Sequence, residues 1–373
     1  MVTNTYAPAR NGVAMWVALS VRELRARGHE VEVLTYSHDR REPGLAGMHE
    51  VRAWAGIDPD FKVTPFAPKI PASLAGESFD VVHVHHPILL GPVGVALGRA
   101  CGAKVCFTCH SVYTDYFDEY YFGLGRGLRG WFDAKVARFV DTCDAVFAPS
   151  SRVERWLRDN GATVRIERAE PPADTGRIRR HDREEARRIL GLGDRPVAFY
   201  IGRIAAEKRV GPLVTEFAGA LDRMPPDALL ALGGSGKRVP TVRRQVRGLG
   251  LEGRVRLLGA LDAEQLSLWY SAADVCTSAS RSETGPLTVV EAMSCACPAV
   301  ALRAPGFEDR VTDGIDGLLV PDEPGCLGQA LARVLSDGDL RARLSAGALS
   351  RSRGCSPEAV TEGMLAMYDS LLA

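Results

Sequence analysis

Short apolar runs alternate with longer helical patterns along the whole chain. Such alternation is typical of βαβ units, in which helices join parallel strands and cover the faces of the sheet. A length of 373 residues is too great for one ordinary hydrophobic core, so we predict two doubly wound α/β domains. In the first half we expect strands at residues 30–35, 51–54, 80–85, 104–108 and 145–148, and helices at 13–27 and 91–101.

The second half repeats this order after a segment with the composition of a linker. Residues 168–182 contain Pro171-Pro172, Gly176 and a cluster of arginines, which favour an irregular connection. We therefore expect domains at 1–170 and 171–355, followed by a C-terminal helix within 356–373. The strands of the second domain are expected at 196–201, 229–232, 254–258, 275–277, 299–301 and 318–320, and its helices at 183–190, 239–249, 263–273 and 324–336.

Charge and composition exclude several classes of protein. The formal net charge is +0, so no overall field attracts nucleic acid or an anionic membrane. The chain does not begin with a basic stretch and an apolar core, and it has no run of about 18 apolar residues, so we expect a cytoplasmic protein. The 9 cysteines are expected to be reduced thiols. Residues 1–4 look like only the end of a strand, which leaves open whether the native chain starts upstream of Met1.

Three patterns resemble cofactor motifs but lack necessary features. Residues 106–110 match the haem-attachment pattern, yet they continue an expected buried strand. Residues 233–237 lack the first glycine and the final Ser or Thr of a phosphate loop. His83, His85 and His86 belong to a strand end, where alternation directs neighbouring side chains to opposite faces. We therefore expect neither a metal nor another cofactor.

A pair of glutamates, Glu283 and Glu291, stands at an expected loop-to-helix junction. Pro286 between them suits the first position of a helix, because its missing N–H would have no partner there. The unpaired N–H groups of a helix N-terminus attract phosphate, and a carboxylate on either side can accept hydrogen bonds from sugar hydroxyls. This combination suits a nucleotide sugar, although solvated surface glutamates share the same local pattern.

The surrounding sequence resembles glycosyltransferase family 4. Gly202-Arg203-Ile204-Ala205-Ala206-Glu207-Lys208 and residues 283–300 are similar to its paired signatures, and residues 6–13, 27–31 and 108–110 are similar to its opening segments. The resemblance covers nearly the whole chain. It implies the α/β GT-B fold, with two Rossmann-like domains facing a central cleft and a C-terminal helix that crosses back to the first domain. It also implies a retaining, metal-independent hexosyltransferase that moves a sugar from a nucleotide diphosphate sugar to a hydroxyl acceptor.

The resemblance assigns roles residue by residue. Arg203 and Lys208 follow an expected strand at its carboxyl end, where open α/β sheets bind ligands, and would neutralise the leaving diphosphate. Glu291 would bind the ribose hydroxyls. Glu283 would bind hydroxyls of the transferred sugar rather than act as a covalent nucleophile, and His110 would face that sugar. The expected catalytic residues are therefore His110, Glu283, Arg203 and Lys208.

Further positions are expected around the donor and the acceptor. The backbone N–H groups of Leu287 and Thr288 would contact phosphate or sugar, and Gly12 would let the backbone approach the donor closely. Pro286 stands where the family usually has glycine, which removes one N–H group and leaves the donor sugar open. The expected donor-binding residues are Gly12, Arg203, Lys208, Ser235, Lys237, Leu258, Glu283, Gly285, Leu287, Thr288 and Glu291. The expected acceptor-side residues are Asn11, His85, Tyr113, Asp115 and Tyr116.

The acceptor is expected to be a lipid or a small molecule, and a UDP-linked donor is preferred. Residues 11–13, 83–87 and 109–116 are most similar to the branch of the family that glycosylates lipids such as diacylglycerol or phosphatidylinositol. The next segment mixes apolar and basic residues, as a helix resting on the inner membrane surface would, but a core-facing helix with a solvated basic side explains it slightly better. Its apolar members are Leu124, Leu128, Trp131, Phe132 and Phe139, and its basic members are Arg126, Arg129, Lys135 and Arg138. A soluble polyol, sugar or secondary-metabolite acceptor stays open.

Two other functions suit the same fold. A sugar-nucleotide epimerase would also use carboxylates and a histidine, but it would need no acceptor. A non-catalytic protein that binds sugar nucleotides would be expected to lack some of the four residues Arg203, Lys208, Glu283 and Glu291. All four are present, and their pattern favours sugar transfer.

Overall fold

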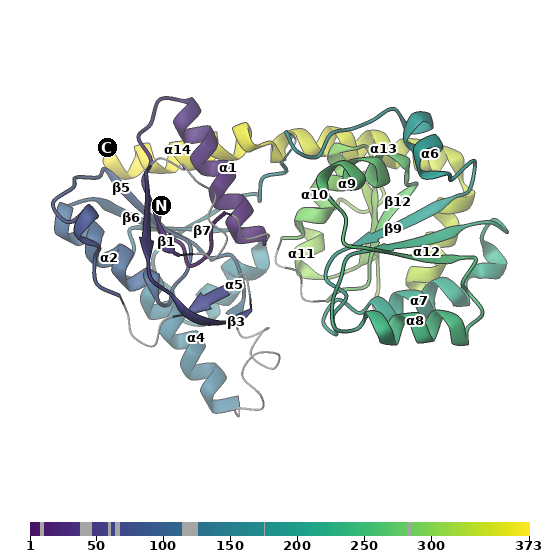
Figure 1. The fold of residues 1–373 in the computed structure, drawn as a ribbon, viewed down its shortest axis with the longest axis horizontal. Coiled ribbons are helices and arrows are strands. Elements are labelled where there is room, and N and C mark those ends of the chain that lie inside the picture. The colour runs from purple at the N-terminus through teal and green to yellow at the C-terminus, as the bar shows by residue number, and fades with distance from the viewer. Residues whose placement is uncertain are drawn as a thin grey trace. The chain divides into compact units, whose positions relative to one another are not determined.

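The computed structural model describes residues 1–373 apart from 8–10, 38–46, 59–60, 64–67, 114–125, 175, 282 and 284. The described residues form two compact units, whose elements are labelled in Figure 1. Unit 1 contains Met1–Pro171 and Pro357–Ala373, and unit 2 contains Pro172–Ser356. The last helix, α14 (Pro357–Leu372), therefore follows unit 2 in the sequence but belongs to unit 1.

Unit 2 is built on a parallel sheet of 6 strands in the order β11-β10-β9-β12-β13-β14. The chain moves outward from β9 to one edge and then from β12 to the other edge. This winding creates a switch point between β9 and β12, which is where ligands bind in doubly wound sheets. The strands are β9 (Val197–Ile201), β10 (Leu229–Gly233), β11 (Val255–Gly259), β12 (Val275–Ser278), β13 (Ala299–Leu302) and β14 (Gly317–Val320).

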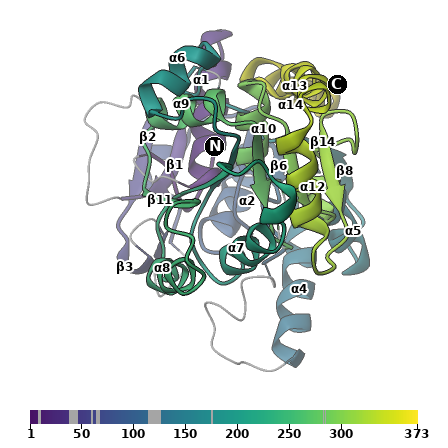
Figure 2. The same cartoon turned by 90° about the vertical axis from the view of Figure 1, so that its right-hand side faces the viewer.

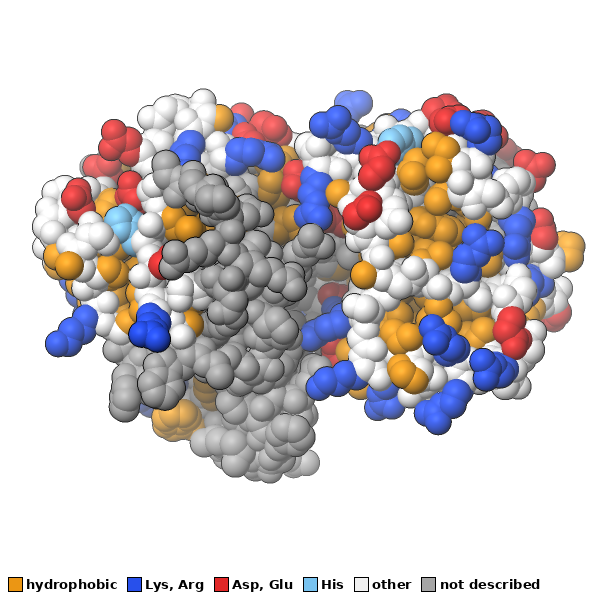
Figure 3. All heavy atoms as spheres, viewed as in Figure 1, with side chains coloured by type: hydrophobic (Ala, Val, Ile, Leu, Met, Phe, Trp, Pro, Cys, Tyr) orange, Lys and Arg blue, Asp and Glu red, His pale blue; other side chains and the backbone are white. Residues whose placement is uncertain are grey.

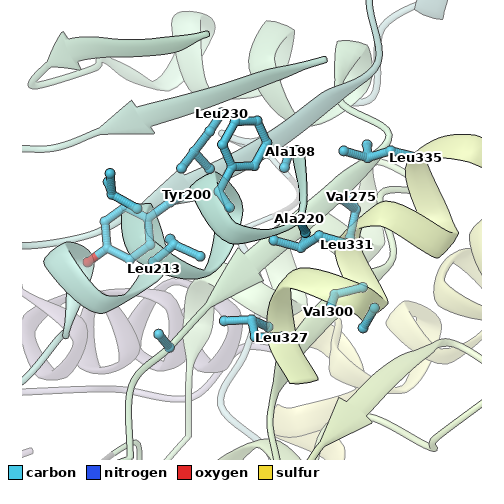
Figure 4. Close-up of a cluster of buried hydrophobic side chains, with 14 of the residues drawn as sticks. Ala198, Tyr200, Leu213, Ala220, Leu230, Val275, Val300, Leu327, Leu331 and Leu335 are labelled. Atoms are coloured by element: carbon cyan, nitrogen blue, oxygen red, sulfur yellow. The ribbon is translucent and has the colours of Figure 1, made fainter. Parts of the chain in front are cut away.

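Helices cover both faces of this sheet (Figure 1): α7, α8 and α12 lie on one face, and α9 and α10 on the other. The side chains of alternate residues of β9 pack on opposite faces of the sheet. Ala198 and Tyr200 join the core beside α7 and α12 (Figure 4), whereas Val197 and Phe199 join the core beside α9. Because both faces are buried, the strands are continuous apolar runs. The helices are α6 (Arg183–Leu190), α7 (Val210–Gly219), α8 (Val239–Gly248), α9 (Ala263–Ala272), α10 (Leu287–Ser294), α11 (Pro305–Glu308), α12 (Cys326–Ser336) and α13 (Gly338–Ser352).

Unit 1 has a similar parallel sheet, and the start of the chain lies in its middle. Val2 bridges β1 and β5, since its N–H donates to the carbonyl of His83 at 2.8 Å and its carbonyl accepts from the N–H of His85 at 2.9 Å. On one side of Val2 lie β1 and β2, and on the other β5, β6, β7 and β8. The strands are β1 (Val33–Tyr36), β2 (Met48–Val51), β5 (Val81–Val84), β6 (Lys104–Thr108), β7 (Ala145–Ala148) and β8 (Arg165–Arg168), beside an antiparallel pair, β3 (Trp54–Asp58) and β4 (Phe61–Val63).

The helices of unit 1 include the returning C-terminal helix. Met364, Met367 and Tyr368 of α14 share an apolar cluster with Leu24 of α1, which fixes α14 to this unit. Figures 1 and 2 both show α4 extending away from the sheet of unit 1. The helices of the unit, besides α14, are α1 (Gly12–Ala26), α2 (Leu90–Cys101), α4 (Arg126–Val140) and α5 (Ser151–Asp159). Within the described ranges, no helix combines the length and the apolar character that crossing a membrane requires.

Most expected elements are present, but some boundaries differ. A single strand at 51–54 was wrong, because β2 ends at Val51 and β3 begins at Trp54. The N–H of Ala53 donates to Ser37 Oγ at 3.3 Å, so it takes no part in the parallel pairing of β1 and β2. Strand β8 was not expected, because it is charged at both ends and only partly buried. Helix α5, also not expected, begins at a Ser150 cap whose side chain accepts from the N–H of Val153.

Candidate functional site

The switch point of unit 2 brings together two residues that lie far apart in the sequence. Lys208 follows β9, and Glu283 follows β12. Lys208 Nζ donates to Glu283 Oε1 at 2.6 Å, and their side chains are 22% and 15% exposed. Partial burial makes this ion pair stronger than one on an open surface. The two loops are therefore tied together where a doubly wound sheet binds its ligand.

Arg203 lies in the same loop as Lys208 and is held through its backbone. The Tyr200 hydroxyl donates to the carbonyl of Arg203 at 3.0 Å. Burial raises the pKa of Tyr200 above its ordinary value, so this hydroxyl keeps its proton and stays a donor. The guanidinium of Arg203 lies 3.1 Å from Glu207 Oε1 and is 42% exposed. A fixed backbone with an accessible guanidinium suits recognition of an anion.

The loop after β10 is packed directly on the loop after β9. The N–H of Ile204 donates to the carbonyl of Ser235 at 2.8 Å, and the N–H of Gly202 donates to that of Gly233 at 3.2 Å. Gly234 has φ +119°, and a Cβ there would lie 1.8 Å from the carbonyl oxygen of Gly202. Only glycine fits at this close approach. Ser235 and Lys237 lie exposed in this loop.

The N-terminus of α10 is formed by Leu287 and Thr288. Pro286 was expected as the first helical residue but instead precedes the helix, because its ψ of 100° is extended. The N–H of Val289 donates to the carbonyl of Pro286 at 3.1 Å. The N–H groups of Leu287 and Thr288 precede it and have no carbonyl of the helix to donate to, and Pro286 provides no side-chain cap. Gly285 comes just before this turn. The arrangement offers N–H groups and a partial positive charge to an anion.

Glu291 lies in α10 and is 7% exposed. Burial raises its pKa to about 7, while a hydrogen bond from Tyr270 and the charge of Arg177 act in the opposite direction. Tyr270 Oη donates to Glu291 Oε2 at 3.0 Å from α9. The carboxyl group therefore changes its ionisation close to neutral pH. Tyr270 was not recognised from the sequence, because a single tyrosine in an apolar helix carries no local signal.

Leu258 lies in β11 and packs partly buried against the core beside α9. The end of β11 is joined to the loop after β10, since the N–H of Gly234 donates to the carbonyl of Gly259 at 2.7 Å. The expected donor-binding residues of unit 2 are thus carried by the loops after β9, β10 and β12, by α10 and by β11.

In unit 1, Asn11 and Gly12 begin helix α1. Asn11 Oδ1 accepts from the N–H of Ala14 at 3.0 Å, and its Nδ2 donates to Thr5 Oγ1 at 2.9 Å. Both ends of the Asn11 amide therefore hold the helix start in place. Gly12 is exposed in the first turn of a 15-residue helix, where its backbone N–H points out of the helix end.

The histidines of unit 1 form a connected cluster beside this helix start. His85 Nδ1 lies 3.0 Å from His110 Nε2, and the ring of Trp16 packs edge-on against His110 with centroids 5.0 Å apart. His83 stacks on His85 at 4.4 Å, so these two share one side of the strand end, as alternation predicts for residues two positions apart. Burial lowers the pKa of all three of His83, His85 and His110. Their rings are therefore neutral at physiological pH.

His86 and His83 make further contacts outside this pair. His86 Nδ1 accepts from the N–H of Asn4 at 3.1 Å. His83 contacts the hydroxyl of Thr108 through Nε2 at 2.7 Å and that of Tyr368 through Nδ1. In the part of the chain that the structure describes, no three His, Cys, Asp or Glu side chains are grouped to hold a metal ion.

Of the remaining acceptor-side expectations, the structure describes Tyr113, which packs against the core of unit 1. Tyr113 packs its ring against Phe132 and Trp156, each with centroids 6.3 Å away. Asp115 and Tyr116 lie outside the described residues.

Helix α4 turns its apolar side to the core of unit 1. Phe132 and Phe139 pack against that core, and Phe139 meets Phe107 edge-on at 5.3 Å. Trp131 is 56% exposed, and Lys135 Nζ lies 5.1 Å from the centre of its ring. For Phe132 and Phe139 the structure thus agrees with a core-facing helix. Leu124 lies outside the described residues, as does the side chain of Leu128.

Charged side chains of both signs are interspersed on the face of unit 2 that Figure 3 shows, in keeping with a formal net charge of +0. On that face the basic side chains are spread over the surface rather than gathered into one patch.

Two family models match the chain. The model described as Glycosyltransferase Family 4 matches residues 10–177, and the model described as Glycosyl transferases group 1 matches residues 182–351. The first match falls within the longer part of unit 1 and the start of unit 2, and the second lies within unit 2.

Two relatives are similar over most of the chain. A D-inositol 3-phosphate glycosyltransferase of Actinosynnema mirum is 36% identical over 390 residues, which cover 96% of this chain and 91% of that protein. An alpha-monoglucosyldiacylglycerol synthase of Streptococcus pneumoniae is 26% identical over 353 residues, which cover 91% of this chain and 79% of that protein.

Two solved structures have the same fold. Sucrose-phosphate synthase from Thermosynechococcus elongatus superposes with a TM-score of 0.80 at 23% identity, covering 99% of this chain and 98% of that one. Anabaena HepE, solved in complex with UDP-glucose, superposes with a TM-score of 0.76 at 16% identity, covering 99% of each chain.

Proposed function

We propose a donor, a reaction course and an acceptor class for this chain, which belongs to glycosyltransferase family 4 and has its two-domain GT-B fold. The chain is a glycosyltransferase. One observation carries the proposal: at the switch point of unit 2, Lys208 and Glu283 join the two loops that precede α7 and α10, and the buried carboxyl group of Glu291 follows in α10.

The proposed donor is a UDP-linked hexose bound by unit 2. Its diphosphate lies at the N-terminus of α10, where Arg203 and Lys208 add positive charge. Glu291 accepts hydrogen bonds from the ribose hydroxyls, and Glu283 accepts them from the transferred sugar. The complex of HepE with UDP-glucose supports this choice of nucleotide. The backbone after β11 is assigned to the base.

The proposed reaction is substitution with retention of configuration and without a metal ion. Arg203, Lys208 and helix-end N–H groups stabilise the charge that develops on the leaving diphosphate, because fixed donors act strongly in a site that excludes water. An oxygen of that diphosphate takes the proton of the acceptor hydroxyl on the same face of the sugar. His110, whose ring burial keeps neutral, is proposed as a further residue of the reaction.

The proposed acceptor is a hydroxyl of a polyol or sugar, either free or carried by a lipid. The named relatives support both sources, since one is a D-inositol 3-phosphate glycosyltransferase and the other an alpha-monoglucosyldiacylglycerol synthase. A lipid acceptor requires contact with a membrane surface. The exposed side chains Trp131, Lys135 and Arg138 of α4 suit such a contact, because they combine an aromatic ring with positive charge.

Calorimetric titration with UDP, GDP, ADP and TDP tests the donor site. We expect UDP to bind, with affinity about tenfold or more weaker in Glu291→Ala, because a hydrogen-bonded carboxylate is lost. Glu252→Ala, at an exposed glutamate of the same unit, is the matched control and should bind as the wild type does. Unchanged UDP affinity in Glu291→Ala would contradict the proposed site. If no nucleotide binds, a non-catalytic role replaces transfer.

Product analysis tests the reaction course. We expect transfer to continue in the presence of a chelator, and NMR of the product to show the anomeric configuration of the donor. An inverted product would contradict retention. A changed sugar nucleotide formed without any acceptor would identify an epimerase instead.

Two acceptor assays separate the sources of the hydroxyl. One offers D-inositol 3-phosphate in solution, and the other offers diacylglycerol in anionic vesicles. Trp131→Ala should lower transfer only in the vesicle assay, because this exposed ring is assigned to the membrane surface. Equal activity of Trp131→Ala and the wild type on vesicles would contradict the contact.

A further inference from the structure

The carboxyl group of Glu291 receives a hydrogen bond from a neighbouring helix. Tyr270 Oη of α9 donates to Glu291 Oε2 at 3.0 Å, and the exposed fractions of the two residues are 0% and 7%. Burial raises the pKa of Tyr270 well above its ordinary value, so the phenol keeps its proton at all pH values near neutrality. A phenol has one proton to donate, and Tyr270 directs it at Glu291.

The ring of Tyr270 is fixed by its packing in the core. It meets Phe199 of β9 edge-on, with centroids 5.5 Å apart and planes inclined by 77°. Phe199 in turn stacks on Trp269 at a centroid distance of 5.6 Å. All three rings belong to the core beside α9. Because a close-packed core holds its side chains in place, the hydroxyl of Tyr270 fixes the position of Glu291 Oε2.

The other oxygen of the Glu291 carboxyl group is left for a ligand. Among the described residues, Tyr270 makes the one hydrogen bond to this carboxyl group, and Oε1 does not belong to the buried polar atoms that lack a partner. Oε1 therefore keeps contact with solvent. A carboxylate oxygen has two lone pairs, so it can accept from two neighbouring hydroxyls such as those of a ribose.

We propose that Tyr270 is a positioning residue for the donor: it holds Glu291 Oε2, so that Oε1 is directed at the two ribose hydroxyls of the nucleotide. This inference rests on the proposed function of Glu291 and adds the residue that orients it. Every group involved lies in unit 2. Tyr270 acts through Glu291 and has no contact of its own with the nucleotide.

The same hydrogen bond assists ionisation of Glu291, and only the ionised group accepts at both oxygens. Burial raises the pKa of Glu291 to about 7, and the bond from Tyr270 is the strongest influence that lowers it. Burial also raises the pKa of Cys276 to about 12 and that of Cys295 to about 11, so both thiols are neutral. The titratable and charged groups around Glu291 are Tyr270 of α9, Cys276 of β12, Cys295 after α10, and Arg177 and Asp174 before α6.

Calorimetric titration of Tyr270→Phe with UDP tests the proposal. At pH 7 the affinity should fall about tenfold, the equivalent of one hydrogen bond. Loss of the donor raises the pKa of Glu291 further, so the pH at which the affinity levels off should move above that of the wild type. Tyr368→Phe is the matched control, because it removes the hydroxyl of another buried, hydrogen-bonded tyrosine, in unit 1, and it should bind UDP as the wild type does.

Two comparisons distinguish positioning from a general structural role. With 2′,3′-dideoxy-UDP, which lacks both ribose hydroxyls, Tyr270→Phe and the wild type should bind equally. In a Glu291→Gln background, adding Tyr270→Phe should change the affinity for UDP by less than about twofold, because residues that act as a unit are not additive. A loss that is equally large with the dideoxy nucleotide, or in the Glu291→Gln background, would overturn the proposal.

The two proposals fail in different ways. Unchanged UDP affinity in Glu291→Ala would reject the ribose contact itself. A loss in Glu291→Ala beside an unchanged affinity and pH profile in Tyr270→Phe would reject the role of Tyr270 alone.

Should Tyr270→Phe fail to fold, NMR of the wild type decides the question. In protein labelled with 13C at tyrosine Cζ, one signal should shift as Glu291 ionises near pH 7, and this shift should be absent from Glu291→Gln. A wild-type spectrum in which no tyrosine signal responds to this ionisation would reject the positioning bond.

Discussion

Glu291 meets two requirements that oppose each other. Burial raises its pKa to about 7, so folding favours the protonated group. The proposed contact with ribose hydroxyls requires the ionised group, which only accepts hydrogen bonds. Tyr270 donates to Glu291 Oε2 and so partly offsets the cost of ionisation. At neutral pH, ionisation of Glu291 therefore lowers the stability of unit 2 but favours the proposed binding of ribose.

Affinity for the donor is expected to rise with pH around neutrality. Binding favours ionised Glu291, whose pKa is about 7 in the free protein. As the pH rises toward 7, the dissociation constant of UDP should therefore fall by up to about tenfold per pH unit. It should level off once Glu291 is fully ionised. Calorimetry from about pH 6 to 8.5 measures the slope. Glu291→Gln is the control, because the phosphates of UDP titrate equally in both proteins. Identical slopes would contradict the assignment.

The same pKa predicts that Glu291→Gln stabilises unit 2 in mild alkali. The pKa of Glu291 in the folded protein, about 7, lies above the ordinary 4.5. The contribution of Glu291 to the free energy of unfolding is therefore complete below pH 4.5 and is lost as the pH rises through 7. Above pH 7 the loss amounts to about 3 kcal/mol, which the neutral amide avoids. Urea unfolding at pH 8 should show a higher midpoint for Glu291→Gln than for the wild type. Glu252→Gln serves as the exposed control, and a lower midpoint for Glu291→Gln would refute the shift.

The ion pair of Lys208 and Glu283 predicts opposite effects on UDP and on UDP-hexose. In Glu283→Gln, Lys208 loses the partner that lies 2.6 Å away, so its charge acts fully on a diphosphate. UDP should then bind up to about tenfold more tightly, whereas kcat for transfer should fall because a sugar ligand is lost. Lys208→Ala should weaken UDP binding. Calorimetry and initial rates on both variants measure this, and weaker UDP binding in Glu283→Gln would argue against the pairing.

Among the elements of unit 2, the loops after β9 and β10 act as one. Arg203 lies between Gly202, whose N–H donates to the last residue of β10, and Ile204, whose N–H donates to the loop after β10. The backbone of Arg203 is therefore fixed on both sides by a neighbouring segment rather than by its own loop. Helix α10 contributes in a different way, since its N-terminus presents N–H groups and the loop before it is joined to Lys208 through Glu283.

Gly234→Ala should disrupt both loops at once. The added Cβ would lie 1.8 Å from the carbonyl oxygen of Gly202, at φ +119°. The backbone strain alone is worth roughly 1–3 kcal/mol, and the displaced loop should also weaken binding of UDP. Gly248→Ala, at the end of α8 with no atom within 4 Å of the new Cβ, is the matched control and should be neutral or stabilising by up to about 1 kcal/mol. Urea unfolding and UDP titration compare the two; equal stability would contradict the close approach.

Over the whole molecule, the two units respond to pH in opposite directions. The buried histidines His83, His85 and His86 all lie in unit 1, and the buried Glu291 lies in unit 2. A histidine whose pKa is lowered by burial binds its proton only in the unfolded state, so unit 1 loses stability as the pH falls below the ordinary value of 6.5. Unit 2 loses the contribution of Glu291 as the pH rises through 7.

Acid should therefore unfold unit 1 first. His83 and His86 each have a pKa of about 3 against an ordinary 6.5, so each costs about 2 kcal/mol of stability at pH 5. Hydrogen exchange followed by mass spectrometry at about pH 5 and 7 should show lost protection in unit 1, including α14, before unit 2. His86→Asn should reduce this acid sensitivity, and the exposed His29→Gln should not. Simultaneous loss of protection in both units would contradict the prediction.

The alternation of apolar and helical segments predicted most of the architecture. The strands at 104–108 and 145–148 have the expected bounds, because buried strands of a parallel sheet leave continuous apolar runs in the sequence, and α14 lies within the expected 356–373. β8 left no such run, since an edge strand is covered on fewer sides and tolerates charge. The family and its GT-B fold were also predicted from local motifs, in which spacing along the chain carries the signal.

The pairings within the site were decided by tertiary structure alone. Lys208 and Glu283 are 75 positions apart, Tyr270 and Glu291 are 21 apart, and His85 and His110 are 25 apart. The sequence determined which residue types stand after which strands, because that depends on local patterns. It did not determine which carboxylate pairs with which lysine, or which histidine contacts another. Those partners are set by how strands and helices pack side by side, and no local propensity records a contact across such distances in the chain.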